Sequence, residues 1–236
     1  MVVTDIDAAA LDGAVSGLEQ EHGRDRVRGY CCDVADERSV RASFAYAVRE
    51  FGGLDVLVSN AGIASAAPVE ETSLELWSRN VGILATGYFL VSREAFALMK
   101  RQGLGGAIVF VGSKNALVAS AGASAYCSAK AAAVHLARCL ALEGADVGIR
   151  ANVVNPDAVI RGSRIWAGEW RRERAEANRI AEEEVEEFYR KRSLMKRNVL
   201  PEDVAEAVYF FAADLSGKST GNILNVDAGN VASFTR

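Results

Sequence analysis

A serine, a tyrosine and a lysine in the middle of the chain have the types and spacing that proton transfer to a hydroxyl group needs. Tyr126 and Lys130 are four residues apart in a helical pattern, so both side chains leave one face of the helix. An ammonium group beside a phenol favours the phenolate and lowers its pKa, as a general base requires. Ser113 comes directly after an apolar run and can hydrogen-bond the same substrate oxygen. Since Tyr–Lys pairs at this spacing are common, Ser113 gives the pattern its weight.

Alternating apolar runs and helical patterns must position these three residues. Continuous Val, Ile and Leu runs separated by helices are typical of a parallel sheet covered on both faces. The sequence therefore predicts a single α/β domain over residues 1–236, a doubly wound parallel sheet. The expected strands are residues 1–5, 26–34, 53–62, 106–113, 147–156 and 221–229, and the expected helices are residues 8–22, 36–53, 73–103 (as one helix or two), 123–144 and 201–215.

The first residues predict one corner of a Rossmann-like dinucleotide fold. A short strand ends at Asp5 and a helix follows, an arrangement in which the acid accepts hydrogen bonds from a ribose. Asp5 would repel a 2′-phosphate, so NAD is favoured over NADP; the alternative is that Asp5 only caps the following helix. A glycine-rich phosphate loop normally lies about 20 residues before this acid. Here only four residues precede it, so the first strand and its loop are expected to lie upstream of Met1.

The missing strand would lie in the middle of the sheet. Burying its four or five large apolar side chains would contribute roughly 10 kcal/mol, whereas a whole domain is stable by only about 5–15 kcal/mol. The loop would also supply the pyrophosphate site. We therefore expect that the chain as written neither folds normally nor binds NAD tightly.

Residues 157–200 are rich in charged and aromatic side chains, and residues 171–192 have a helical pattern. Two interpretations are equally supported. The segment is either a solvated helical face or a lid over a ligand, since loops at the carboxyl ends of strands form ligand sites in such sheets.

Composition excludes several classes of function. The formal net charge of −4 argues against a nucleic-acid surface, and no apolar run has the length of a membrane span or the form of a signal peptide. The four cysteines have neither disulfide nor metal-ligand spacing, and the two histidines have no partner motif, so we expect reduced thiols, a cytoplasmic protein and no metal site.

Several motifs in register resemble the short-chain dehydrogenase/reductase family over almost the whole chain. Besides Ser113, Tyr126 and Lys130, the matching positions are Asp33-Val34, Asn60-Ala61-Gly62, Asn155-Pro156, Thr220-Gly221 and Asp227-Ala228-Gly229. The resemblance implies NAD(P) binding and hydride transfer at a carbinol carbon of a small molecule. It makes Tyr126 the base, Ser113 the residue that orients the substrate, and Lys130 the link between the ribose hydroxyls and the tyrosine.

The resemblance also implies the remaining contacts. Asp33 lies near the adenine amino group, and the turn at Asn60-Ala61-Gly62 packs against the adenosine. The full cofactor set is Asp5, Asp33, Val34, Asn60, Ala61, Gly62, Tyr126, Lys130, Pro156 and Val159, and the substrate set is Ser113, Asn115, Arg161 and Arg164. Arg161 and Arg164 would bind a carboxylate or phosphate; the equally supported alternative is pairing with acids of their own segment.

One helix departs from the family pattern. The family usually carries an asparagine seven residues after the tryptophan that is Trp77 in this chain. That asparagine holds a water molecule for proton relay. In this chain that position is Leu84, which cannot hold a water, and Asn80 is the candidate substitute one helical turn earlier.

A narrower resemblance extends from Met1 to Arg236. The segments SNAGIASAAPVEETSLELW and NPDAVIRGSRIW are similar to the dehydrogenase half of bifunctional rhamnulose-1-phosphate aldolase/alcohol dehydrogenases. This implies an aldolase module upstream and NAD-dependent oxidation of L-lactaldehyde to L-lactate in rhamnose breakdown. The helices around residues 87–99 and 125–142 are expected to form a dimer or tetramer interface. The alternatives are a generic ketone or sugar reductase, and a catalytically inactive remnant that serves as a binding subunit.

Overall fold

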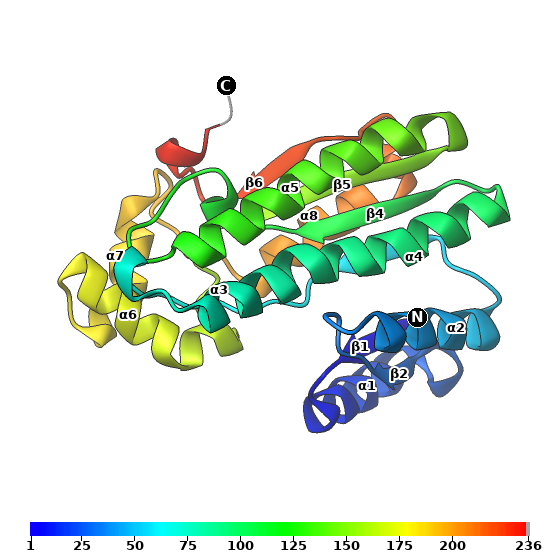
Figure 1. Cartoon of the computed structure of the whole chain (residues 1–236), viewed down its shortest axis with the longest axis horizontal. Coiled ribbons are helices and arrows are strands. Elements are labelled where there is room, and N and C mark those ends of the chain that lie inside the picture. The colour runs from blue at the N-terminus through cyan, green and yellow to red at the C-terminus, as the bar shows by residue number, and fades with distance from the viewer. Residues whose placement is uncertain (235–236) are drawn as a thin grey trace.

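The structure, a computed structural model, describes residues 1–234 and has an α/β architecture of parallel strands and covering helices (Figure 1). Its strands form two separate sheets. One sheet pairs β1 (Val2–Asp5) with β2 (Arg28–Cys31). The other has the order β3-β4-β5-β6, formed by β3 (Val56–Ser59), β4 (Gly106–Val111), β5 (Ile149–Pro156) and β6 (Ile223–Val226). All pairings are parallel, as the sequence predicts.

The four-stranded sheet contains the main core. α4 (Gly87–Gln102) and α5 (Ser124–Gly144) cover one face, where Phe110, Ile108 and Met99 are fully buried. α8 (Pro201–Ala212) covers the other face and packs Phe211 against Val109 and Val154 (Figure 1). β4 is buried on both faces and its sequence is an unbroken apolar run, whereas β5 also buries the polar side chains Asn152 and Asn155. The carboxyl ends of β4 and β5 position the residues that follow them.

β1, α1 (Ala8–His22), β2 and α2 (Glu37–Phe51) form an N-terminal unit beside this sheet. α2 joins the unit to α4 through Val40, Leu90 and Val91. Asp7, not Asp5, caps α1 by accepting a hydrogen bond from the Ala10 amide at 3.1 Å, so the cap alternative for Asp5 is wrong.

The strand that ends at Asp5 does not pair with β3. Within residues 1–234 no segment forms a strand between them, and the edge of β3 leaves Val56 and Val58 exposed. The predicted parallel sheet is therefore present in two parts.

The region predicted as one helix or two is one continuous helical segment from Leu74 to Gln102. α3 (Leu74–Val81) passes through a π-helical turn (Gly82–Thr86) into α4. Its length and apolar composition match those of a membrane-crossing helix, but Tyr88, Ala95 and Met99 are buried against the sheet. Burial of this kind is typical of a core helix.

The charged segment after β5 is not the single helix that its pattern predicts. It contains α6 (Glu169–Asn178) and α7 (Val185–Arg192), with short 3₁₀ turns before each helix. Arg179 ends α6 in the left-handed conformation, with φ of 56°. The chain therefore folds back on itself and α7 lies against α6 (Figure 1).

Candidate active site

A cavity of about 330 Å³ lies at the carboxyl ends of β4 and β5. Its floor is the end of these strands, one wall is the start of α5, and the opposite wall comes from α6 and α7. Ligand sites of open parallel sheets lie at this edge. Eight residues predicted from the sequence line the cavity: Asn60, Gly62, Ser113, Asn115, Tyr126, Lys130, Pro156 and Val159.

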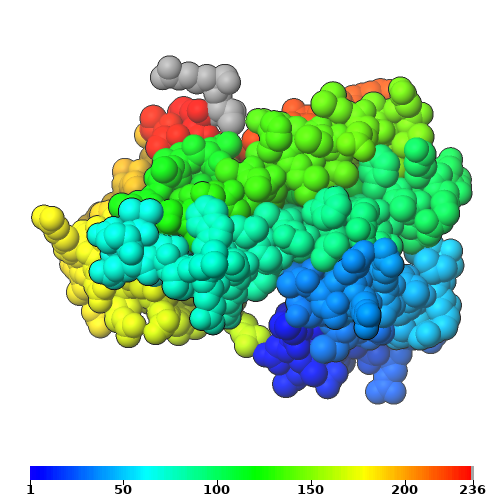
Figure 2. All heavy atoms as spheres, viewed as in Figure 1, coloured from blue at the N-terminus to red at the C-terminus, as the bar shows by residue number. Residues whose placement is uncertain are grey.

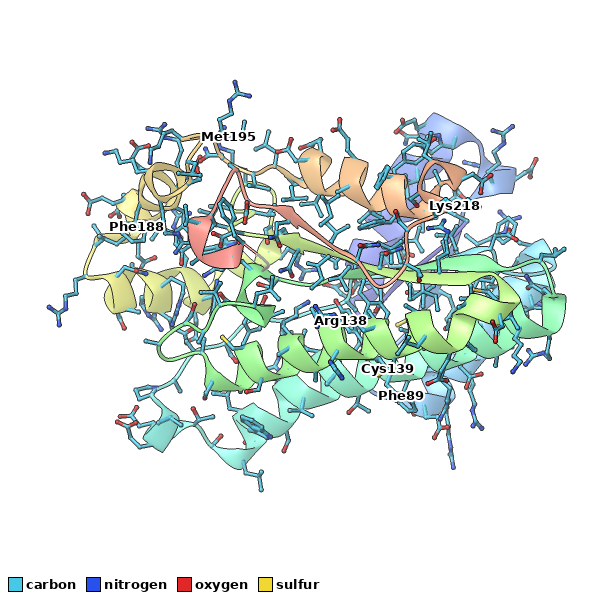
Figure 3. The ribbon with its side chains drawn as sticks, turned by 90° about the horizontal axis from the view of Figure 1, so that it is seen from above. Phe89, Arg138, Cys139, Phe188, Met195 and Lys218 are labelled. Atoms are coloured by element: carbon cyan, nitrogen blue, oxygen red, sulfur yellow. The ribbon has the colours of Figure 1, made fainter. Side chains whose placement is uncertain are left out.

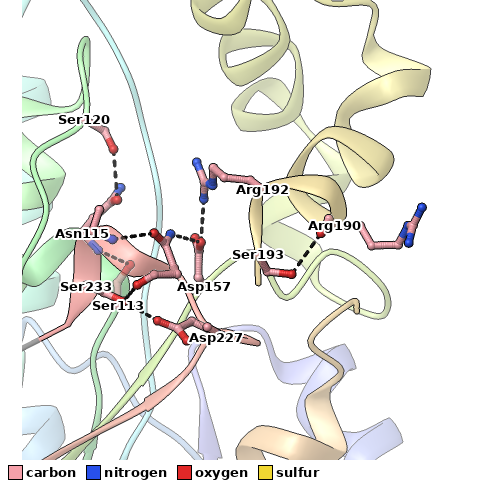
Figure 4. A network of polar contacts seen from close by, with 12 residues as sticks. Ser113, Asn115, Ser120, Asp157, Arg190, Arg192, Ser193, Asp227 and Ser233 are labelled. Atoms are coloured by element: carbon pink, nitrogen blue, oxygen red, sulfur yellow. Dashed lines mark hydrogen bonds and ion pairs between the residues drawn. The ribbon is translucent and has the colours of Figure 1, made fainter. Parts of the chain in front are cut away.

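Ser113 is fixed by the strand next to its own. Its backbone amide donates to Oδ1 of the buried Asn155 on β5 at 2.7 Å, and its Oγ accepts from the Asn115 amide at 3.1 Å. Asn115 also accepts from the Ser120 hydroxyl at 3.0 Å, a contact drawn in Figure 4. The loop after β4 is thus held from several directions, which places the Ser113 hydroxyl in the cavity.

Tyr126 and Lys130 leave the same face of α5 and are both buried. The Lys130 Nζ donates to the Val111 carbonyl at 2.8 Å and to the Tyr88 hydroxyl at 3.1 Å. Tyr88 in turn donates to the same carbonyl at 2.7 Å. The lysine is therefore held on the end of β4 by a buried hydroxyl from α4.

Burial dominates the acidity of these groups. It raises the pKa of Tyr126 to about 12, although the Ser113 hydroxyl opposes this shift, and it lowers the pKa of Lys130 to about 7. The expected lowering of the tyrosine pKa by the lysine is absent, since Lys130 is not among the groups that shift it. The reason is geometric, because Lys130 directs its hydrogen bonds to Tyr88 and Val111.

The cofactor residues predicted near the chain start lie outside the cavity. Asp5 is exposed at the end of β1 and accepts from the Asp7 amide at 2.8 Å. Asp33 accepts from the Ala35 amide at 2.9 Å. Val34 packs against Gly87, where a Cβ would lie 3.0 Å from the valine side chain, so the glycine allows α4 to approach. Ala61 is exposed between Asn60 and Gly62.

Arg161 and Arg164 also lie outside the cavity lining and are paired with acids. Arg161 donates to Glu186 at 2.7 Å, within the same charged segment. Arg164 donates to Asp7 at 2.9 Å and so connects this segment with the N-terminal unit. Figure 2 shows an opening between the blue N-terminal unit and the yellow segment, with yellow-green atoms reaching the blue ones. In this state the two arginines serve as pairing residues.

The family of the chain follows from the comparisons with known proteins. Residues 1–230 match the model of a protein family described as "Enoyl-(Acyl carrier protein) reductase". In structure, the chain is similar to sorbitol-6-phosphate 2-dehydrogenase SrlD from Erwinia amylovora, with a TM-score of 0.92 and 32% identity over 98% of this chain and 89% of the other. The chain belongs to the short-chain dehydrogenase/reductase family. Its predicted family membership and Rossmann-like α/β fold are thereby confirmed.

Two curated relatives are similar to this short-chain dehydrogenase/reductase in sequence. The uncharacterized oxidoreductase YuxG of Bacillus subtilis is 47% identical over the whole chain, which spans only 34% of that relative. D-threitol dehydrogenase of Mycolicibacterium smegmatis is 32% identical over 97% of this chain and 82% of its own length. The chain thus belongs to a family of oxidoreductases, and one of its relatives is named as a dehydrogenase of D-threitol.

The helix that departs from the family pattern is now explained in structural terms. Leu84 lies in the π-helical turn, is fully buried, and would be 3.4 Å from a Cβ on Gly62. Asn80 donates to Ser65 at 2.7 Å and to the Leu76 carbonyl at 2.8 Å and does not line the cavity. Neither residue therefore hydrogen-bonds to Lys130, whereas the Tyr88 hydroxyl does.

Sequence reasoning missed most of the wall opposite Ser113. Trp166, Trp170 and Tyr189 line the cavity, and Trp170 packs against Tyr126 with the rings tilted by 52° and their centroids 5.5 Å apart. Arg174 and Lys114 are buried beside them. A signal was present, since Trp166, Trp170 and Arg174 follow one another at four-residue spacing on one side of a helical pattern.

A network of polar contacts links the cavity-lining Asp157 to the residues that follow β6. Asp157 accepts from Arg192 at 2.5 Å and from Asn230 at 2.8 Å (Figure 4). Asp227 accepts from the Ser233 hydroxyl and from the Gly229 amide. In residues 1–234 no group of three or more His, Cys, Asp or Glu side chains is arranged to hold a metal ion.

Proposed function

We propose that the chain is an NAD-dependent oxidoreductase that acts on the carbinol carbon of a small hydroxy compound. The observation that supports this most is the convergence of Ser113, Tyr126 and Lys130 on one cavity at the carboxyl ends of the strands. Ser113 would hydrogen-bond the substrate oxygen, and Tyr126 would accept its proton. The buried Lys130, with a pKa near 7, would gain or lose a proton close to neutral pH.

The cavity fits the ring end of a nicotinamide cofactor beside a small substrate. Gly62 and Val159 offer an open and an apolar surface for the ring, and Asn60 offers polar groups next to them. When bound, the nicotinamide supplies the hydride acceptor. Val159 and its neighbours would hold the carboxamide through backbone groups, and Lys130 would hold the ribose hydroxyls.

Asp5 supports NAD over NADP. Its carboxylate is exposed at the end of β1, where it would accept hydrogen bonds from a ribose and repel a 2′-phosphate. A solved relative, the 3-ketoacyl-(acyl-carrier-protein) reductase from Brucella melitensis, was crystallised with NADH and is 26% identical, with a TM-score of 0.83 over 97% of this chain and 86% of the other.

The substrate class is proposed at two levels. The coarser level is a small polyol or hydroxy compound, which the similarity to D-threitol dehydrogenase supports. The finer level is L-lactaldehyde, oxidised as its hydrate to L-lactate in rhamnose breakdown by a cytoplasmic protein that carries an aldolase module upstream. The segment from Asn155 to Trp166 supports this level through the narrower resemblance described above.

The long helices support a homo-oligomer. Figure 3 labels Phe89 on α4 and Arg138 and Cys139 on the adjoining α5. Phe89 is 44% exposed and Leu142 is 82% exposed, although both belong to helices whose other faces form the core. A second copy of the chain would cover this surface in a dimer or tetramer.

A substrate panel tests the proposal. The protein is incubated with NAD or NADP and one of L-lactaldehyde, D-threitol or sorbitol. In parallel assays it is incubated with simple ketones and the reduced cofactor. We expect NAD-dependent oxidation of a hydroxy compound. We also expect kcat/KM to fall at least a hundredfold in the Ser113→Ala variant. Reduction of ketones alone would support the generic reductase. Absence of any turnover, together with no thermal shift on adding NAD, would support the inactive remnant.

A further inference from the structure

The substrate cavity contains two buried cations without anionic partners. Arg174 on α6 is 5% exposed, and Lys114, directly after Ser113, is 7% exposed; both line the cavity. Buried charges are normally paired, because leaving them unpaired costs several kcal/mol. Two unpaired cations facing one cavity therefore need an explanation.

The contacts of Arg174 leave most of its hydrogen-bonding capacity unused. Its Nη1 donates to the Ala121 carbonyl at 3.1 Å, and its guanidinium carbon lies 4.6 Å from the centre of the Trp170 ring. Its Nε is buried and has no hydrogen-bond partner. Among residues 1–234 no carboxylate lies within 4.0 Å of the group, and neighbouring Glu173 forms no ion pair with it. A guanidinium group offers five donors, so a ligand could accept several more.

The carboxylate of the cavity lining is already paired with groups outside the lining. Asp157 is the carboxylate among the described residues that line the cavity, and it accepts from Arg192 at 2.5 Å and Asn230 at 2.8 Å. Burial lowers the pKa of Lys114, Asp157 partly opposes this shift, and the charges of Arg192 and Arg174 add to it. Among the described residues that line the cavity, the cationic groups Arg174, Lys114 and Lys130 therefore outnumber this one carboxylate.

We propose that Arg174 and Lys114 form an anion subsite, so that the substrate carries a carboxylate or a phosphate in at least one of its two redox forms. A planar guanidinium stacked on Trp170 is already oriented to donate two parallel hydrogen bonds to such an anion. Lys114 supplies a second charge from the loop that holds Ser113, which places the anion a short distance from the reacting hydroxyl. This inference rests on the proposed function, because it names the substrate class of the same site.

Matched pairs of small molecules test the subsite without turnover. L-lactate is compared with propane-1,2-diol, and sorbitol 6-phosphate with sorbitol, so that each pair differs chiefly in its anionic group. Binding is followed by tryptophan fluorescence in the absence of cofactor, since Trp166 and Trp170 line the cavity. We expect at least one anion to bind tenfold or more tightly than its neutral counterpart, and the pair that shows this distinguishes a carboxylate from a phosphate subsite.

Substitutions locate the binding. Arg174→Met keeps an apolar stem against Trp170 and is expected to weaken anion binding at least tenfold. Arg172→Gln is the matched control, because Arg172 is an exposed arginine of α6 that pairs with Glu169. It should change the affinity less than twofold. Lys114→Met provides a second variant if Arg174→Met fails to unfold cooperatively, and it too should weaken anion binding.

Three results would overturn the proposal: neither anion binds better than its neutral counterpart, the cavity variants bind anions as well as the wild type, or Arg172→Gln loses affinity equally. The test is independent of the proposed function. Failure of turnover with intact anion binding would reject the dehydrogenase, whereas turnover without anion binding would reject only the subsite.

Discussion

At the scale of single residues, the Tyr88 hydroxyl holds the Lys130 ammonium group through a hydrogen bond. The phenol is fully buried, accepts from the Lys130 Nζ at 3.1 Å and donates to the Val111 carbonyl at 2.7 Å. Leu84 occupies the position where the family carries an asparagine. The Tyr88 hydroxyl is therefore the polar group that α4 contributes to the lysine.

Tyr88→Phe should change the acidity of Lys130. Removing an acceptor disfavours the ammonium form and lowers the lysine pKa further. The acidic limb of kcat/KM that belongs to this lysine should move to lower pH, and the free energy of unfolding should fall by about 1–2 kcal/mol. The measurement is the pH profile of both enzymes. Tyr30→Phe is the control, and equal profiles for Tyr88→Phe and wild type would contradict this role.

Lys130 should also give stability a specific pH dependence. Its pKa in the folded state is about 7, below the value of 10.5 of an unperturbed lysine, so the unfolded state binds more protons between these values. Stability should therefore rise with pH from about 7 toward 10. Above pH 10 the raised pKa of Tyr126 acts in the opposite direction. The phenol ionises at lower pH in the unfolded state than in the folded state, so the folded state loses stability as pH rises.

Lys130→Met tests this linkage by denaturant unfolding at pH 7 to 9.5. The variant should be more stable than wild type at pH 7, by a few kcal/mol at most, and the difference should shrink as pH rises. Lys100 is exposed, so the stability of the Lys100→Met variant should change with pH in parallel with that of the wild type. A Lys130→Met curve parallel to wild type would show that the lysine is not desolvated in the fold.

The placement of Ser113, Tyr126 and Lys130 on one cavity could be predicted because their side chains come from a strand end and one helix face, which local patterns describe. The chemistry of the opposite wall could not. Arg174 lies in a run of charged residues in the sequence. It is buried while most of the others are not, because α6 packs this side chain against the cavity. The pKa values likewise depend on burial, which spacing does not reveal.

At the scale of elements, α6 and α7 determine whether the site is covered. Trp166 contacts Trp170 and Tyr189 with ring centroids 6.2 and 5.2 Å apart, and Trp170 reaches Tyr126. This aromatic cluster favours the lid interpretation of residues 157–200 over the solvated face. Most of the charged side chains of this segment are exposed. The segment therefore has a solvated outer face as well as an aromatic inner face over the cavity.

Trp166→Ala should loosen this lid without unfolding the sheet. Removing a buried tryptophan costs about 3–5 kcal/mol in a well-packed core, and here the loss falls on α6 and α7. Hydrogen exchange of residues 164–192 should accelerate at least tenfold and KM should rise, while exchange in β4 and β5 stays unchanged. Trp77→Ala, which removes a partly exposed tryptophan of α3, is the control. Unchanged exchange in residues 164–192 would contradict the lid.

Element positions were predictable where the pattern is long and periodic. α2 and α5 begin and end within two residues of the expected bounds, with Asp36 capping α2 as its first-turn chemistry requires. The break between α6 and α7 was not predicted, because Arg179 in a left-handed conformation carries no glycine signal. The π-helical turn at Leu84 also has no local sequence marker.

At the scale of the whole molecule, the sheet is interrupted between β1 and β3. Two-stranded sheets are marginally stable alone, and α1 buries only Leu11 among its side chains. The N-terminal unit is joined to the remainder through the contacts of α2 with α4 and through the exposed pair of Arg164 and Asp7. It should therefore open separately from the main core.

Hydrogen exchange of the 236-residue chain tests this difference. Amides of β1 and α1 should exchange at least tenfold faster than those of β4 and β5, with α8 as an internal control for a helix on the sheet's other face. Equal protection of β1 and β4 would show that the two sheets unfold as one unit. Thermal unfolding of this chain with and without saturating NAD measures whether it binds the cofactor.

The measurement that tests the account most directly is the NAD-dependent oxidation rate of Tyr126→Phe against wild type. Phenylalanine keeps the ring that packs on Trp170 and removes only the group that would accept the substrate proton. The account predicts that kcat falls by a thousandfold or more, while NAD binding and thermal stability stay close to wild type. A Tyr126→Phe enzyme that retains more than a third of wild-type kcat would contradict the assignment of this cavity as the dehydrogenase site.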